Sequence, residues 1–234
     1  MVNKNRTFFQ NILFSLSRKR TFLRLFLAHK KKQTTKFEYE IMKEFLLSSQ
    51  EFGGSYIYQT HPKINLKGER PTIGRYKIYN LEKYLKKDME ILDVGGNIGF
   101  FSLFVSNKVK HVDVVEHNPA LMKICEKVKN KLKIENLTTY SQDIKKYQPD
   151  KKYDLIFSFA IHKWVGLELN EYIKLLFNLL KKDGIILIES HTLNRRTDGL
   201  EEFLKNNEDI KILEKGITDD HHGNLRKFFY IKKI

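Results

Sequence analysis

The chain has 234 residues, of which 41% are hydrophobic and 12% aromatic, and this length and composition suit one folded domain of ordinary size. They exclude a disordered chain, and the four prolines exclude a Pro-rich linker between domains. The net charge of +15 is uneven, because residues 1–36 hold ten Lys or Arg and no Asp or Glu, whereas the other 198 residues carry 33 basic and 28 acidic side chains.

The basic tail belongs to an N-terminal segment that we predict to be helical over residues 1–50. Phe22–Lys32 places apolar residues beside cations, and Phe37–Leu47 reads as a second helix. Such a tail suits an anionic partner: the inner face of a membrane, a nucleic acid such as RNA, or an acidic glycan. A solvated arm without a single partner is the alternative. The sequence predicts no oligomeric state.

One cysteine, Cys125, excludes an internal disulfide. It falls on an apolar helix face, which favours a packed thiol over a nucleophile. No segment reads as an export signal, and no apolar run approaches the roughly 20 residues that span a bilayer. We therefore expect a reducing, cytoplasmic setting, with membrane contact limited to the tail.

Strands and helices alternate from residue 89 onward, after an irregular stretch at 53–76 and a short helix near 79–86. This alternation predicts a mostly parallel sheet with helices on both faces, and the short link between the last two strands predicts an antiparallel edge hairpin. The division expected is a helical, substrate-side extension at 1–71 and a catalytic domain at 72–234. The predicted strands are Glu90–Gly95, His111–His117, Leu137–Asp143, Tyr153–Ala160, Ile185–Ser190, Ile210–Gly216 and Arg226–Ile234, and the main predicted helices are Phe100–Asn107, Asn118–Leu132 and Asn170–Gly184.

The first of these strands runs into a glycine-rich turn, DVGGNIGFF. Gly95, Gly96 and Gly99 let the backbone approach a ligand closely and open onto a helix N-terminus. The dinucleotide pattern G-x-G-x-x-G does not fit, because Asn97 stands two residues after Gly95. The turn instead has the form D-x-G-x-N-x-G.

This turn resembles the first motif of the class I S-adenosylmethionine (SAM)-dependent methyltransferases, with Asn97 in place of the middle glycine. Two further acids follow in the family's order, because Glu116 ends the second strand and Asp143 ends the third. The resemblance covers roughly 72–234 and implies a Rossmann-like α/β fold with a seven-stranded sheet. It implies SAM as cofactor and S-adenosylhomocysteine as product. By the same resemblance the cofactor contacts are Asp93, Gly95, Gly96, Asn97 and Gly99 on the methionine side, Glu116 and His117 at the ribose, Asp143 and Ile144 at the adenine, and Ser158 on the pocket floor.

The exit of the fourth strand, FSFAIHKW, places three functional side chains at the edge where such sheets bind ligands. His162 could take a proton from a hydroxyl acceptor, whereas His162 and Lys163 could instead hold an anion. Trp164 offers a stacking face. The alternative is a packed tryptophan beside a solvated lysine.

The run from Phe157 to Leu167 resembles, locally, the RNA methylphosphate capping enzymes, and the layout of the chain resembles methyltransferases of bacterial capsule pathways that make O-methyl phosphoramidate. Both imply an oxygen on phosphorus as acceptor. The leading hypothesis is O-methylation of a phosphate or phosphoramidate on a small nucleotide- or sugar-linked acceptor in surface polysaccharide synthesis. RNA terminal phosphate methylation, and sugar-hydroxyl methylation with His162 as base, are the alternatives.

Other polar segments could complete an acceptor pocket. The stretch GERPTIGRY offers two arginines suited to anion binding and a tyrosine, and the end of the fifth strand and the hairpin loop supply histidines and an arginine. The histidine spacing has no recognisable zinc pattern, so we predict no metal site. These candidate substrate residues are Arg70, Arg75, Tyr76, His191, His221, His222 and Arg226.

Overall fold

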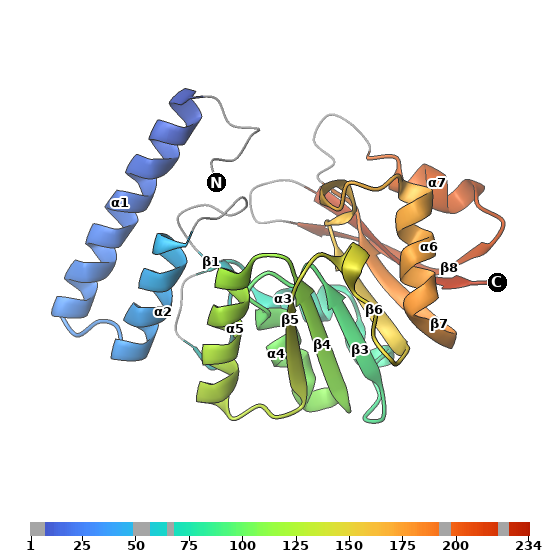
Figure 1. Cartoon of the computed structure of the whole chain (residues 1–234), viewed down its shortest axis with the longest axis horizontal. Helices are drawn as coiled ribbons and strands as arrows, with labels where there is room; N and C mark the ends of the chain where they lie inside the picture. The colour runs from blue at the N-terminus through green and yellow to red at the C-terminus, as the bar shows by residue number, and fades with distance from the viewer. Residues whose placement is uncertain (1–7, 49–56, 65–67, 192–197, 220–224) are drawn as a thin grey trace.

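The computed structural model describes residues 8–48, 57–64, 68–191, 198–219 and 225–234, and its centre is a twisted seven-stranded sheet (Figure 1). The strand order is β5-β4-β3-β6-β7-β9-β8, and only β9 runs antiparallel to its neighbours β7 and β8. This confirms the predicted mixed sheet with an edge hairpin. The strands are β3 (Glu90–Val94), β4 (His111–Glu116), β5 (Leu137–Ser141), β6 (Tyr153–Phe159), β7 (Leu180–Glu189), β8 (Ile210–Asp219) and β9 (Leu225–Lys233).

Helices cover both faces of this sheet, because alternate strand residues point to opposite sides. Ile91 of β3 faces one core, together with α2, α4 and α5. Leu92 faces the other, with α6 and α7. The helices are α1 (Phe8–Lys30), α2 (Lys36–Leu47), α3 (Thr72–Ile78), α4 (Phe100–Val105), α5 (Pro119–Leu132), α6 (Leu169–Leu179) and α7 (Leu200–Asn206).

The N-terminal helices form an outer layer on α5 (Figure 1). The α2 helix begins at a capping box, in which the Thr35 side chain accepts from the Glu38 N–H and the Glu38 carboxylate accepts from the Thr35 N–H. Glu44 then pairs with two lysines of α5, Lys123 at 3.3 Å and Lys127. The helical interpretation of this segment is confirmed for Phe8–Lys30 and Lys36–Leu47.

The helix predicted over 170–184 is shorter than expected. It ends at Leu179, because Leu180 adopts an extended conformation and pairs with Tyr153 as the first residue of β7. Gly184 consequently lies inside a strand instead of closing a helix. The N-cap of this helix is Glu168, which forms a capping box with Glu171, and not Asn170, with which the predicted helix begins.

Two other stretches differ from their sequence-based description. The segment 53–76 is not wholly irregular, because β1 (Ile57–Gln59) and β2 (Gly68–Arg70) pair in parallel and α3 follows them. The helix expected near 79–86 is reduced to a single 3-10 turn, η1 (Leu81–Lys83), since α3 has already ended before left-handed Asn80. The α7 helix after β7 was not predicted.

Candidate active site

The glycine-rich turn joins β3 to α4 at the carboxyl edge of the sheet. Gly95, Asn97 and Gly99 have φ values of +67°, +56° and +68°, a region open to glycine and tolerated by asparagine. A Cβ on Gly95 would lie 1.8 Å from the Cδ1 of Ile161, and one on Gly99 would lie 2.4 Å from the Sγ of Cys125. The turn therefore requires glycine at both positions, and Cys125 is the buried packing residue predicted.

Asp93 lies at the foot of this turn and is fully buried. Its Oδ2 accepts a hydrogen bond from the Ser102 hydroxyl at 2.6 Å, whereas its Oδ1 has no partner among the described residues. Burial raises the pKa of Asp93 to about 6, against the opposing effects of Ser102 and Arg75. A buried carboxylate oxygen that lacks a donor, beside backbone kept open by glycines, fits the ammonium of a methionine moiety.

Glu116 ends β4 and holds the turn in place. Its Oε2 accepts from the Asn97 N–H at 3.2 Å, and its Oε1 accepts from the Asn118 N–H at 3.0 Å. His117 lies 2.9 Å from the same Oε1 and is half-exposed. A carboxylate has about four acceptor positions, so Glu116 keeps capacity for a ligand hydroxyl.

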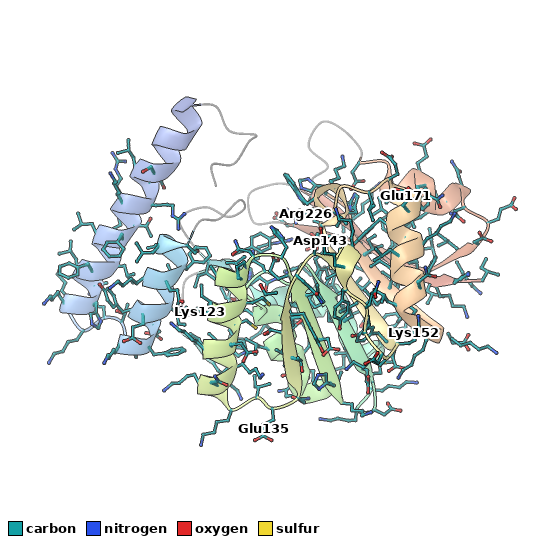
Figure 2. The ribbon with its side chains drawn as sticks, viewed as in Figure 1. Lys123, Glu135, Asp143, Lys152, Glu171 and Arg226 are labelled. Carbon is teal, nitrogen blue, oxygen red and sulfur yellow. The ribbon has the colours of Figure 1, made fainter. Side chains whose placement is uncertain are left out.

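The third acid, Asp143, follows β5 and begins the 3-10 turn η3 (Ile144–Lys146). Its Oδ1 accepts from the Lys145 N–H at 2.9 Å, and its side chain is partly exposed above buried Ile144. Figure 2 shows Asp143 and Arg226 at the same end of the molecule, with Glu135 at the opposite end. Ser158, in contrast, is fully buried, and its hydroxyl lies 2.8 Å from that of Tyr172 on α6, in the core beneath the site.

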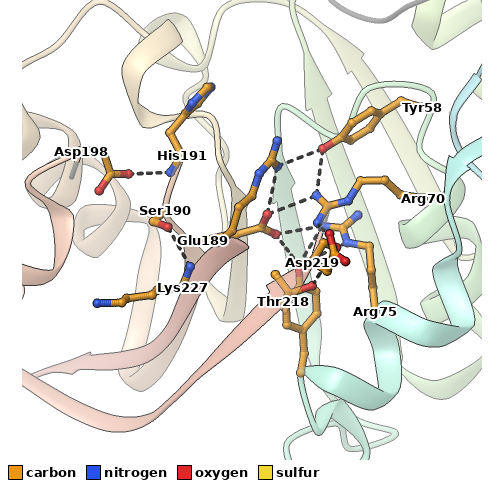
Figure 3. Close-up of polar contacts among 12 residues, drawn as sticks. Tyr58, Arg70, Arg75, Glu189, Ser190, His191, Asp198, Thr218, Asp219 and Lys227 are labelled. Atoms are coloured by element: carbon orange, nitrogen blue, oxygen red, sulfur yellow. Dashed lines mark hydrogen bonds and ion pairs between the residues drawn. The ribbon is translucent and has the colours of Figure 1, made fainter. Parts of the chain in front are cut away.

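Three arginines converge on one carboxylate at the end of β7 (Figure 3). Glu189 pairs with Arg70 at 3.1 Å, with Arg75 at 3.2 Å and with Arg226 at 3.0 Å, and it also accepts from the Tyr79 hydroxyl. We call these four charged residues the arginine cluster. The sequence indicated the arginines as anion-binding groups, but not that a buried glutamate joins them.

In the arginine cluster, the charges of the three arginines outweigh the effect of burial on Glu189. Burial alone would raise the pKa of Glu189, but Arg75, Arg70 and Arg226 outweigh it and hold that pKa at about 2. The Tyr58 hydroxyl accepts from both Arg70 and Arg226, at 2.9 and 3.1 Å. The Nε of Arg70 and one terminal nitrogen of Arg75 have no acceptor among the described residues.

Tyr76 does not join the arginine cluster. Its ring packs edge-on against Phe104 at 5.4 Å, and the Lys108 ammonium lies 5.1 Å from its centroid. Lys108 belongs to η2 (Ser106–Lys108), which leads into the start of β4, so Tyr76 faces away from the carboxyl edge. Arg75, one residue earlier, points the other way, over the Phe159 ring at 4.6 Å.

The exit of β6 forms the 3-10 turn η4 (His162–Trp164), and His162 is buried there. Its Nε2 lies 3.1 Å from the Oδ2 of Asp198, which also accepts from the His191 N–H at 2.5 Å. Burial would raise the pKa of Asp198, but His162 and the backbone N–H groups of His191 and Leu200 hold that pKa below its ordinary value. Asp198 thus binds the two histidine segments together.

Trp164 and His191 lie beside this pair. The Trp164 indole N–H donates to the Nε2 of His191 at 3.2 Å, and burial and Arg226 lower the pKa of His191, so this imidazole is a neutral acceptor. Lys163 is exposed. His221 and His222 lie outside the described residues. Among the residues that are described, no cluster of three or more His, Cys, Asp or Glu is placed to hold a metal ion.

The chain also matches a known protein family. The model of a methyltransferase domain matches residues 85–228, which is more than half of the chain. The chain belongs to the methyltransferase domain family. Malonyl-[acyl-carrier protein] O-methyltransferase 2 of Ilyobacter polytropus is 32% identical over 147 residues, which cover 62% of this chain and 52% of that protein. The chain thus spans about half the length of this curated relative.

Solved structures show the same methyltransferase fold at low identity. A SAM-dependent methyltransferase from Thiobacillus denitrificans, in complex with S-adenosyl-L-homocysteine, has a TM-score of 0.57 and 14% identity, over 68% of this chain and 91% of its own. WbdD, crystallised with a kinase inhibitor, has a TM-score of 0.62 and 16% identity, over 82% of this chain and 47% of its own. These likenesses show the fold, and the family match over residues 85–228 shows membership of the methyltransferase domain family.

We predict that Glu189→Gln strongly destabilises the methyltransferase domain. The variant leaves three largely buried guanidiniums without their carboxylate, and breaking a buried charge network costs about 3 kcal/mol or more. Urea unfolding at pH 7 measures this loss, with Glu40→Gln as control, because Glu40 forms only an exposed contact with Lys36.

The pH dependence of this loss has a fixed sign. Because the folded pKa of Glu189 lies below its ordinary 4.5, its stabilisation is present above about pH 4.5 and is lost as the pH falls towards 2. The gap between wild type and variant should shrink over that window. A gap that stayed constant down to pH 2 would contradict the ionic origin of the effect.

We predict that Glu116→Ala weakens SAM binding about 100-fold or more. The variant removes the carboxylate that the resemblance assigns to the ribose, and each hydrogen bond to a charged group contributes about 1.5–3 kcal/mol. Titration calorimetry measures the dissociation constant. Glu135→Ala, at the opposite end of the molecule (Figure 2), should bind SAM as wild type does. Unchanged affinity in the Glu116 variant would remove Glu116 from the cofactor site.

Proposed function

We propose that the methyltransferase domain transfers a methyl group to an anionic oxygen of a small, phosphate- or phosphoramidate-bearing acceptor. The observation that carries this proposal is the arginine cluster, in which three guanidiniums meet one carboxylate at the carboxyl edge of β7. The Arg70 and Arg75 nitrogens that have no acceptor among the described residues could donate to an acceptor oxygen. Such an oxygen is already deprotonated near pH 7 and needs no base.

The cofactor side of the proposal assigns the acids at the strand ends. When bound, SAM supplies a methyl group already activated on a sulfonium. Asp93 would hold the methionine ammonium through its unpartnered Oδ1, and Glu116, with His117 beside it, would hold the ribose. Asp143 and Ile144 would bind the adenine through its amino group and its ring face. The backbone at Gly95, Gly96, Asn97 and Gly99 would surround the methionine half, above a floor that includes Ser158.

The relatives named for malonyl-acyl carrier protein are consistent with this acceptor chemistry. A malonyl thioester has a free carboxylate, which is also an anionic oxygen nucleophile. A planar carboxylate and a tetrahedral phosphate can bind the same guanidinium group, because each accepts two parallel N–H hydrogen bonds. We therefore retain the phosphate-type acceptor, in surface polysaccharide synthesis at the cytoplasmic side of a membrane, and include a malonyl thioester in its test.

An acceptor screen with labelled SAM tests the proposed class directly. Nucleoside phosphates, sugar phosphates, phosphoramidates, RNA with a terminal phosphate, a malonyl thioester and neutral sugars would be compared at equal concentration. We expect methylation of the small phosphate-type acceptors. Methylation of neutral sugars alone would overturn the proposal, and methylation of RNA alone would favour the RNA alternative.

We predict that Lys163→Ala lowers kcat/KM for the anionic acceptor about fivefold and leaves SAM affinity unchanged. Lys163 is exposed at the exit of β6, where a single screened charge contributes about 1 kcal/mol. Lys152→Ala, at the far end of the same strand (Figure 2), is the matched control. Equal effects of the two substitutions on kcat/KM would mean that Lys163 has no special contact with the acceptor.

A second candidate function, methylation of a sugar hydroxyl, is favoured by the contact of His162 with Asp198 at 3.1 Å. A carboxylate that orients an imidazole is the usual support for a general base. The two functions make different predictions for His162→Gln. A hydroxyl acceptor would lose about 100-fold or more in kcat, whereas an anionic acceptor should lose less than about tenfold, because no proton has to be removed. Single-turnover rates on the best substrate of the screen decide between them.

A further inference from the structure

The outward face of α1 carries a row of exposed leucines flanked by cations. Successive helix residues turn by about 100°, so Leu16, Leu23 and Leu27 fall within about 40° of one another. Their side chains are 48%, 58% and 49% exposed. Lys19 and Lys30 lie on one side of this row and Arg20 and Arg24 on the other, and all four are exposed. We call these seven residues the α1 outer face.

The opposite side of α1 fixes this orientation. The guanidinium of Arg18 donates to the carbonyls of Phe45, Leu46 and Ser48, which are the last acceptors of α2. Phe22 and Leu25 pack against the core, and the His29 ring stacks on Tyr39 at 4.3 Å. Because these contacts fix the rotation of α1, the leucine row cannot turn inward without breaking them.

Charge and position favour one occupant for this face. We propose that the α1 outer face docks on an anionic lipid membrane, with the leucines at the level of the acyl boundary and the cations among the headgroups. Residues 1–36 contain ten basic and no acidic residues, so nothing in this segment neutralises the face. Figure 1 shows α1 as the outermost layer, on the side of α2 away from the sheet.

Two other occupants fit the face less well. An RNA backbone would pair with Lys19, Arg20, Arg24 and Lys30 but would leave the leucines in water. A second copy of the chain would bury the leucines but would bring two sets of these cations together. An anionic bilayer satisfies both the apolar row and its flanking charges. Among the described residues no helix is long and apolar enough to cross a membrane, so the proposed contact lies in the interface plane.

Vesicle flotation of the full chain tests this proposal. The probes are phosphatidylcholine vesicles with and without about one third phosphatidylserine. We expect binding to the anionic vesicles alone, and weaker binding at 1 M salt, where the Debye length falls from about 10 Å to about 3 Å. A chain with Leu16, Leu23 and Leu27 all changed to Gln should bind at least about tenfold less. A chain with Lys19, Arg20, Arg24 and Lys30 changed to Gln should lose about fivefold per charge.

The control changes three equally exposed residues away from α1, Ile78, Leu213 and Ile217, to Gln. This control chain should bind anionic vesicles as wild type does, and circular dichroism melting should show that all three variants fold. Loss of binding in the control chain as large as in the leucine variant would overturn the proposal. Two other results would also overturn it: binding of an RNA oligonucleotide but not of vesicles, or a dimer in light scattering that the leucine variant abolishes. None of these readouts involves methyl transfer.

Discussion

The contact of Glu189 with Arg70, Arg75 and Arg226 is the interaction on which the active-site end of the molecule depends. It ties four segments to one point: β2, α3, β7 and β9. A carboxylate this deeply buried is unfavourable alone, and the guanidiniums are equally unfavourable without it. β2 and α3 are therefore held against the end of β7 by this charge network. Through Arg70, β2 and its partner strand β1 are joined to the end of β7.

The same network explains why two buried carboxylates, on strands that β6 separates, behave differently. Glu189 is surrounded by cations, and its pKa falls to about 2, whereas Asp93 has Ser102 as its hydrogen-bond partner and a pKa of about 6. Asp93 keeps one carboxylate oxygen without a donor among the described residues, whereas the Glu189 carboxylate pairs with three guanidiniums. The two carboxylates are separated by the width of β6, since the sheet order is β3-β6-β7.

Much of the fold and of the cofactor side could be predicted from the sequence, because its signals are local. The turn at Gly95 to Gly99 and the acids Glu116 and Asp143 each end a strand whose apolar pattern is clear, and the structure has strands and helix starts at these places. The errors occurred where tertiary pairing overrides local preference. Leu180 lies in a good helical pattern, yet its backbone pairs with Tyr153. The cofactor roles of these acids remain predictions.

The acceptor side was less predictable, since its contacts join residues far apart in the chain. The sequence places Glu189 near the end of a predicted strand. Its partners Arg70, Arg75 and Arg226, however, lie 119, 114 and 37 residues away in the chain. Asp198 had no signal at all, because it follows a polar stretch and precedes a short helix that the pattern did not indicate. Only the fold shows that Asp198 accepts from the His191 backbone and lies beside His162.

Asp198 also changes what the HKW turn can contribute. The Trp164 indole donates to the Nε2 of His191, and burial and Arg226 lower the pKa of His191, so this imidazole acts here as a hydrogen-bond acceptor. His162 is buried against a carboxylate that offsets any charge it carries. Lys163 is thus the exposed cation of the HKW turn, and with the arginine cluster it carries the cationic part of the acceptor proposal. Because an arginine keeps its charge at every physiological pH, the ion pairs of Glu189 with Arg70, Arg75 and Arg226 persist between about pH 6 and 8.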